Sequence, residues 1–230
     1  MHILWKWLKR LTPSPMIMNP QDYWIAPLGA FIGMLGTAYL SYTILGVNNP
    51  WLIAPMGASA VLLFVIPASP LAQPWSVIGG NLIAAAVGVT FASLIASPLL
   101  ASALAGSVAI AIMMRLRCLH PPSGAVALTA VLGGPSIQHL GYGFVISPVL
   151  FNSVALVSFA IIYHQFSSHR YPHEPKTTAP SSAGLPEIKL EDVESALRQH
   201  HELLDIDEND LLNIVKQTEV IAKKRQNKRQ

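Results

Sequence analysis

The sequence predicts an all-α membrane protein: a polytopic helix bundle of two three-element repeats, followed by a small helical cytoplasmic tail. Three observations support this prediction. Hydrophobic residues make up 52% of the chain and charged residues only 12%, which is unusual for a soluble domain. Between Asp22 and Arg170 there is no acidic residue, and the only lysines or arginines are Arg115 and Arg117. A short Pro-x-Gly-Ala motif also occurs twice.

Composition divides the chain into four regions. Residues 1–20 place tryptophans beside lysines and an arginine, which predicts an interfacial anchor helix instead of a cleaved signal peptide. Residues 21–166 form the transmembrane domain. Residues 167–186 are rich in proline, serine, threonine and alanine and predict a flexible linker. Residues 187–230 form the helical cytoplasmic tail.

Six apolar runs occupy the transmembrane domain, and turn residues such as Asn48-Asn49-Pro50 and Gly133-Gly134-Pro135 separate them. Small residues at four-residue spacing, such as Gly29 and Gly33, indicate helices that pack closely. The six runs lie at residues 23–45, 51–66, 75–96, 99–114, 121–132 and 144–165.

The second and fifth runs are too short for the roughly 20 residues that a helix needs to cross a bilayer. We therefore expect broken or re-entrant helices there. Their first residues resemble each other, and Asn81 and Asn152 lie at similar places in the third run of each half. The repeated segments are Pro55-Met56-Gly57-Ala58-Ser59 and Pro122-Ser123-Gly124-Ala125. If the short helices traverse the membrane, the two halves form an inverted repeat, as in many transporters and channels; if they re-enter, the halves are parallel.

Charge favours the inverted arrangement. With six crossings and a cytoplasmic N-terminus, Arg115, Arg117 and the tail all lie in the cytoplasm, whereas the outer loops contain no lysine or arginine. This distribution obeys the positive-inside rule. A bacterial-type inner (plasma) membrane is the simplest location, because few residues precede the first run.

Three motifs indicate a family. The segments 54–64, Ser69-Pro70-Leu71-Ala72-Gln73-Pro74-Trp75 and 115–125, which contains His120-Pro121-Pro122, together resemble the HPP family of integral membrane proteins, named for the His-Pro-Pro tripeptide. The resemblance covers roughly residues 20–166. Members in photosynthetic organisms have been assigned nitrite transport, so the resemblance implies a membrane transport fold with nitrite as a candidate substrate. Some relatives carry CBS nucleotide-sensing modules after a helical stretch, but too few residues follow here to hold them.

The two proline-started helices suggest an anion site. Proline at the first helical position is a good helix starter, and the N–H groups that follow it, on residues 56–58 and 123–125, are expected to be free. Two such positive helix ends near mid-membrane favour a small anion. The predicted substrate-binding residues are Pro55, Met56, Gly57, Ala58, Ser59, Asn81, His120, Pro122, Ser123, Gly124, Ala125 and Asn152.

Several of these residues have a structural alternative. His120 either braces the helix break or contacts and protonates the permeant species. Arg115 and Arg117 are topology anchors, an anion-attracting vestibule, or both. Asn81 and Asn152 are expected to make interhelical hydrogen bonds or to line a pore. Cys118 has no second ligand at metal spacing, so neither a metal nor a cofactor is predicted.

The tail predicts two short helices with apolar faces. Asp207 and Glu208 open the second helix and Lys223-Lys224-Arg225 closes it, as the helix dipole prefers. Two such helices are expected to form a helical hairpin that associates with itself or binds a partner.

Two functions fit the sequence. The first is a transporter or channel for a small inorganic anion, with nitrite the leading candidate and the anion held at the facing N-termini of the broken helices. The alternative is a membrane-embedded regulatory or scaffold protein that acts through its cytoplasmic tail. An enzyme is not predicted, because the runs lack a carboxylate and an evident nucleophile–base pair. The expected partners are the lipid bilayer, the anion and a second copy of the chain in a homo-oligomer, but not nucleic acid.

The charge distribution yields a topology prediction. In a chain that lacks Cys118, Ser136→Cys should react with a membrane-impermeant maleimide added to intact cells, because residues 134–142 face outward while residues 115–119 share the cytoplasm with the tail. Protection of this cysteine in an expressed variant, together with labelling of a cysteine beside Arg115, would instead favour re-entrant short helices.

Overall fold

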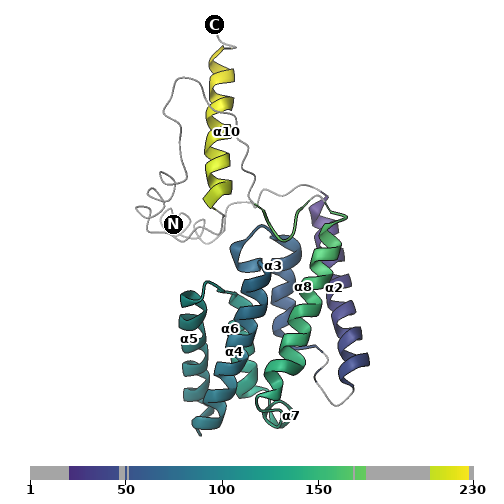
Figure 1. Cartoon of the computed structure of the whole chain (residues 1–230), viewed down its shortest axis with the longest axis vertical. Coiled ribbons are helices and arrows are strands. Elements are labelled where there is room, and N and C mark those ends of the chain that lie inside the picture. The colour runs from purple at the N-terminus through teal and green to yellow at the C-terminus, as the bar shows by residue number, and fades with distance from the viewer. Residues whose placement is uncertain (1–20, 47–49, 51, 168, 175–207, 228–230) are drawn as a thin grey trace, which may run out of the picture.

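The computed structural model describes residues 21–46, 50, 52–167, 169–174 and 208–227 (Figure 1). Every regular element in these ranges is a helix, which confirms the predicted all-α membrane bundle. The predicted anchor at residues 1–20, most of the linker and the first tail helix lie outside the described residues. The second tail helix is α10 (Glu208–Asn227), close to its predicted bounds.

The first half of the bundle contains α2 (Asp22–Leu45), α3 (Pro55–Val65) and α4 (Pro74–Leu94), with the short 3-10 helix η1 (Pro70–Ala72) before α4. Residues 52–54 are not helical, and α3 begins at the proline of the second apolar run. The prolines at the starts of α3 and α4 occupy the first helical position, where proline is favoured.

The second half contains α5 (Pro98–Arg115), α6 (Pro121–Leu132) and α8 (Phe151–His164). A single-turn helix, α7 (Pro135–Gln138), and a π-helical segment, η2 (Val145–Leu150), precede α8. The sixth apolar run was expected to form one regular helix, but it breaks at Ser147, whose φ is −129° and ψ is 111°. Pro148 explains the break, because proline donates no backbone hydrogen bond and its ring crowds the preceding turn.

The six segments alternate in direction along the bundle (Figure 1). We call the two ends the Asp22 end and the Leu45 end, after the first and last residues of α2. The chain ends α2 at the Leu45 end and begins α4 at the Asp22 end, with α3 between them (Figure 1). In the part of the chain that the structure describes, four helical segments are long and apolar enough to cross a membrane, at Asp22–Leu45, Pro74–Leu94, Pro98–Arg115 and Val145–His164.

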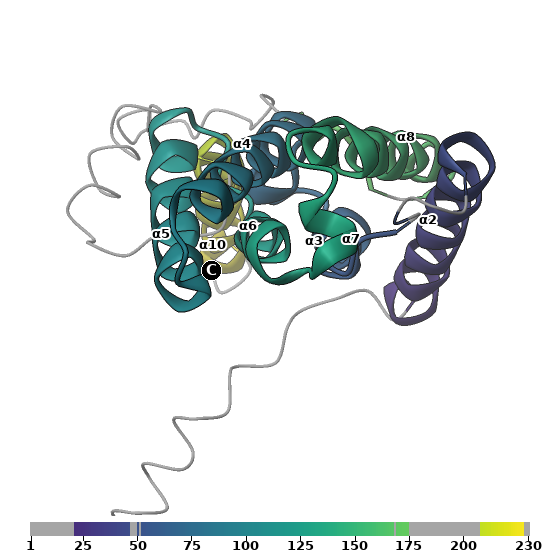
Figure 2. The same cartoon turned by 90° about the horizontal axis from the view of Figure 1, so that it is seen from below.

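The packing follows the inverted repeat. The first helix of each half packs against the third helix of the other half, so α2 lies on α8 and α5 lies on α4. Each short helix also contacts the third helix of the other half: α3 meets α8, and α6 meets α4. Seen along the bundle, α2 and α5 lie at its opposite edges, with α3 and α6 between them (Figure 2).

Small residues allow these close contacts. A Cβ added at Gly33 of α2 would lie 2.5 Å from the Phe64 ring, and one added at Gly88 of α4 would lie 2.6 Å from the backbone oxygen of Ala127 in α6. Ala101, Ala105 and Ala109 of α5 are fully buried. The small residues therefore serve helix packing, as their spacing indicated.

The Gly88 contact yields a stability prediction. Gly88→Ala should lower the free energy of unfolding by about 1–3 kcal/mol, because the new methyl group meets backbone that cannot rotate away. Gly106→Ala is the matched control: a Cβ at Gly106 meets nothing within 4 Å, so this change should be neutral or stabilise by about 0.4–1 kcal/mol. Thermal unfolding midpoints in detergent test the pair, and equal midpoints would contradict the packing argument.

Candidate functional site

The starts of α3 and α6 overlap side by side in the interior of the bundle. Ser59 lies more than one turn into α3, yet its hydroxyl is 2.8 Å from His120, the residue immediately before α6. Because successive segments alternate in direction, α3 and α6 run in opposite directions, so their first turns pass each other instead of pointing at each other end to end.

His120 joins three segments at this overlap. Its side chain is fully buried, with Nδ1 2.8 Å from the carbonyl oxygen of Leu71 and Nε2 2.8 Å from the Ser59 hydroxyl. A carbonyl oxygen only accepts, so Nδ1 carries a proton, and Nε2 of the neutral ring accepts from Ser59. The three sequence motifs that resemble the HPP family therefore meet at one imidazole, which acts as a brace.

Asn81 of α4 connects the start of α6 to the second half of the bundle. Its Oδ1 accepts a hydrogen bond of 2.7 Å from the Ser123 hydroxyl, and its Nδ2 donates to the Ser153 hydroxyl at 2.9 Å. The Ser153 hydroxyl donates in turn to the Val149 carbonyl oxygen. All three polar side chains are fully buried, so the chain of hydrogen bonds is shielded from solvent.

Asn152 of α8 makes the equivalent connection in the other half. Its Oδ1 accepts a hydrogen bond of 3.2 Å from the backbone N–H of Ile53, just before α3, and its Nδ2 donates to the Ser41 hydroxyl of α2 at 2.7 Å. Each repeated asparagine thus supports the start of the other half's short helix. Both make the interhelical hydrogen bonds that were one of the two expectations for them.

Three backbone N–H groups that were expected to be free are in fact bonded. Those of Met56 and Gly57 donate to the carbonyl oxygens of Ile53 and Ala54, and that of Ser123 donates to His120. The physical reason is that each short helix begins with a tight 3-10-like turn, which uses donors that an α-helical first turn leaves unpaired.

The repeated glycines lie beside open space. A Cβ added at Gly57 or Gly124 meets no heavy atom within 4 Å. Ala58 and Ala125, which follow them, are exposed, whereas Pro55, Met56 and Pro122 are buried. The predicted site residues therefore divide into a buried, hydrogen-bonded set and a less shielded set around the two glycines.

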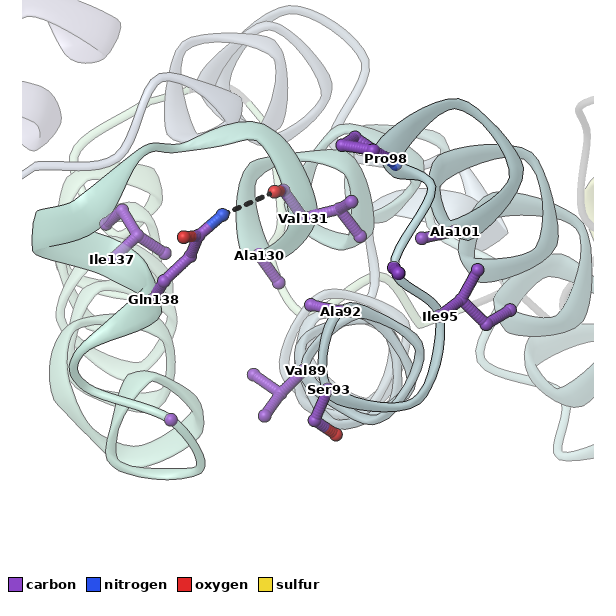
Figure 3. Close-up of a pocket in the computed structure, with 12 residues that line it drawn as sticks. Val89, Ala92, Ser93, Ile95, Pro98, Ala101, Ala130, Val131, Ile137 and Gln138 are labelled. Carbon is purple, nitrogen blue, oxygen red and sulfur yellow. Dashed lines mark hydrogen bonds between the residues drawn. The ribbon is translucent and has the colours of Figure 1, made fainter.

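A cavity of about 340 Å³ opens at the Leu45 end of the bundle, between α4, α5, α6 and α7 (Figure 3). Its polar groups come from Ser93 and from Gln138, whose Nε2 donates to the Val131 carbonyl oxygen at 3.2 Å. We call the buried, hydrogen-bonded side chains described above the polar layer: Ser41, Ser59, Asn81, His120, Ser123, Asn152 and Ser153. Within this layer, Asn81 lies about 12 Å along α4 from Val89, the cavity residue nearest to it on that helix, at 1.5 Å per residue. The close contact of Gly88 with Ala127 separates the cavity from the polar layer.

Both predicted arginines are exposed at the Asp22 end. Arg115 ends α5, and Arg117 follows it in a turn with a φ of 55°. The Trp75 indole at the start of α4 donates to the Leu116 carbonyl oxygen at 3.2 Å, which holds this turn against the bundle. The arginines are thus separated from the buried layer, as a vestibule or a topology anchor would be.

Sequence reasoning missed part of the polar layer. Ser41 and Ser153 were not predicted, although polar side chains in apolar runs are a recognisable signal. Gly80 was also missed: a Cβ there would lie 2.8 Å from the Cys118 carbonyl oxygen and 2.9 Å from the Ser123 hydroxyl. Glycine at this position lets the segment leading into α6 lie directly on α4.

The fold and the site define a class, a polytopic helical membrane protein in which two interrupted helices meet in a buried polar layer. Residues 15–172 match the transmembrane region of the HPP family. The chain belongs to this family, as its three motifs predicted.

Two proteins of Dictyostelium discoideum, both named only as transmembrane proteins, are similar to this chain. One is 34% identical over 165 residues, covering 69% of this chain and 53% of the relative. The other is 34% identical over 177 residues, covering 73% of this chain and 61% of the relative. The chain thus spans little more than half the length of these relatives. No solved structure matches it significantly.

The bracing role of His120 yields a prediction. His120→Ala should lower the free energy of unfolding by roughly 2–4 kcal/mol, because it leaves a cavity and removes a buried donor from the Leu71 carbonyl. The control is His139→Ala, which replaces an exposed histidine and should change stability by less than about 0.5 kcal/mol. Detergent unfolding midpoints measure both, and an undiminished midpoint for His120→Ala would argue against the brace.

Proposed function

We propose that the protein is a membrane transporter or channel for a small inorganic anion, with nitrite as the leading candidate. The observation that carries the proposal is the buried polar layer where α3 and α6 overlap. Polar groups inside a membrane are costly and are concentrated at transport pathways, and broken helices in inverted repeats form the substrate sites of many transporters. A scaffold that acted only through its tail would need neither feature.

The sign of the substrate's charge follows from the charges around the layer. The transmembrane helices contain no acidic residue other than Asp22, at the first position of α2. The formal charges nearest the start of α6 in the sequence are Arg115 and Arg117, which favour an anion at the Asp22 end. The positive ends of the α3 and α6 dipoles add to this preference inside the bundle. Nitrite is favoured because members of the family in photosynthetic organisms have been assigned its transport.

The less shielded backbone around Gly57 and Gly124 is the proposed contact surface for the anion. Ser59, Ser123, His120 and the two asparagines form the wall behind it. His120 offers a way to couple transport to protons, because a protonated ring can donate to the Ser59 hydroxyl. That hydroxyl is then free to donate to the Pro55 carbonyl oxygen, which already lies 3.4 Å away.

We propose that the protein lies in a bacterial inner membrane, with the Asp22 end and the tail in the cytoplasm. The arrangement of the bundle supports this orientation. Arg115, Arg117 and Arg170 all belong to segments at the Asp22 end, whereas the loops at the Leu45 end carry no lysine or arginine.

The test is flux into proteoliposomes. Gly57→Val and Gly124→Val should each lower uptake of the transported anion by about tenfold or more, because a branched side chain shields the backbone that contacts it. Gly106→Val is the matched control, since a side chain there also meets nothing within 4 Å and Gly106 lies on α5, outside the proposed contact surface. Nitrite, nitrate, formate and chloride would be compared with empty liposomes.

Two results would count against transport. If the unmodified protein moves none of the four anions, the scaffold alternative through the tail gains. If both valine variants conduct as well as the Gly106→Val control, the anion does not pass along the glycine faces.

A further inference from the structure

The cavity at the Leu45 end has an equivalent position at the Asp22 end, because the halves form an inverted repeat. Ser93, in the cavity wall, follows Asn81 by the same twelve residues by which His164 follows Asn152. Val131, also in the wall, follows Pro122 by the same nine residues by which Phe64 follows Pro55. The counterpart of the cavity is therefore the space around His164 and Phe64.

Large side chains fill this counterpart. The Phe64 and His164 rings stack with their centroids 6.0 Å apart, and Tyr163 meets Phe64 edge-on at 5.4 Å. His164 Nε2 donates to the Leu63 carbonyl oxygen at 2.8 Å. Ser93 and Val131 therefore line open space at the Leu45 end, whereas His164 and Phe64 close the equivalent space at the Asp22 end.

A segment beyond the repeat completes the closure. Residues 169–174, which we call the strap, fall in the predicted flexible linker, yet Tyr171 is only 6% exposed. Its ring lies 5.8 Å from that of His164, and its hydroxyl donates to the Ala72 carbonyl oxygen at 2.8 Å. Burial raises the pKa of the Tyr171 phenol, so the hydroxyl keeps the proton that it donates.

Two further contacts hold the strap on the bundle. His169 Nε2 lies 3.1 Å from a carboxylate oxygen of Asp22, at the start of α2. The backbone N–H of His173 donates to Oε1 of Gln73, directly after η1. The strap therefore reaches from α2 to η1 across the end of α8, and all of its described contacts are at the Asp22 end.

We propose that the strap, with Tyr171 as its plug, is the gate that closes the Asp22 end of the transport pathway, while the cavity beside α7 is the entrance at the Leu45 end. This inference rests on the proposed anion transport. In this structure the Asp22 end is closed by the strap, and the contact of Gly88 with Ala127 separates the entrance at the Leu45 end from the polar layer. Passage of the anion requires Tyr171 to leave the space around His164, which breaks its hydrogen bond to Ala72 and exposes the ring.

Cysteine accessibility tests the gate without relying on transport. In a chain lacking Cys118 and held in lipid nanodiscs, Ala72→Cys places a thiol on the fully buried residue whose carbonyl oxygen accepts from Tyr171, whereas Ser93→Cys places one in the open cavity. Adding Tyr171→Ala should speed maleimide labelling at position 72 by about tenfold or more, because the strap loses its buried anchor. Tyr171→Phe, which keeps the ring, should have a smaller effect, and labelling at position 93 should not change.

A second variant covers the case in which Tyr171→Ala fails to fold. His169→Ala removes the contact between the strap and Asp22. Because this change also loosens the strap, it should speed maleimide labelling at position 72. If both variants fold and labelling at position 72 stays slow in each, the gate proposal is overturned.

Flux separates this inference from the function on which it rests. If the parent protein transports an anion, Tyr171→Ala should raise its flux or its leak; unchanged flux with unchanged labelling overturns the gate alone. If labelling speeds up but no variant moves any anion, the strap is a movable cover and the transport proposal fails.

Discussion

The structure depends on one constraint, which is that backbone polar groups buried in a bilayer must find their partners within the protein. The two short helices begin inside the bundle and bring backbone ends and polar side chains into an apolar interior. The first turns of the short helices pair several of their own N–H groups, and His120, Asn81 and Asn152 pair further groups by reaching other segments of the bundle. The interruptions that make the bundle polar at its centre are thus also what bind its halves together.

The exchange of partners between the repeats is a consequence. Asn81 supports the start of α6 and Asn152 the start of α3, so neither half can satisfy its own short helix with its own asparagine. The close contacts at Gly80 and Gly88 have the same effect, because they press α4 onto the segment 118–130 of the other half. Movement of one half against the other would therefore act directly on the polar layer.

The two halves share the order and packing of their three main helices but differ in the side chains at the two ends of the bundle. Ser93 and Val131 leave a cavity at the Leu45 end, whereas His164, Phe64 and the strap close the Asp22 end. For the proposed transporter this asymmetry distinguishes the two sides of the membrane. It also gives residues just beyond the repeat a role in the bundle, since Tyr171 belongs to its buried core.

The sequence by itself determined the membrane class, the family and the approximate positions of the six segments, because hydropathy, turn residues and helix-starting prolines act locally. It did not indicate the break at Ser147 or the non-helical start of the second run. It did indicate which polar residues matter, since a histidine or asparagine in an apolar run stands out. Only the tertiary structure decided their partners: that Leu71 lies against His120, and that the first turns of α3 and α6 use their own N–H groups. Tyr171 could not be assigned to the core from a segment that reads as a linker, because its burial depends on Ala72 and His164, which are distant in the sequence. Contacts of this kind arise only when helices pack.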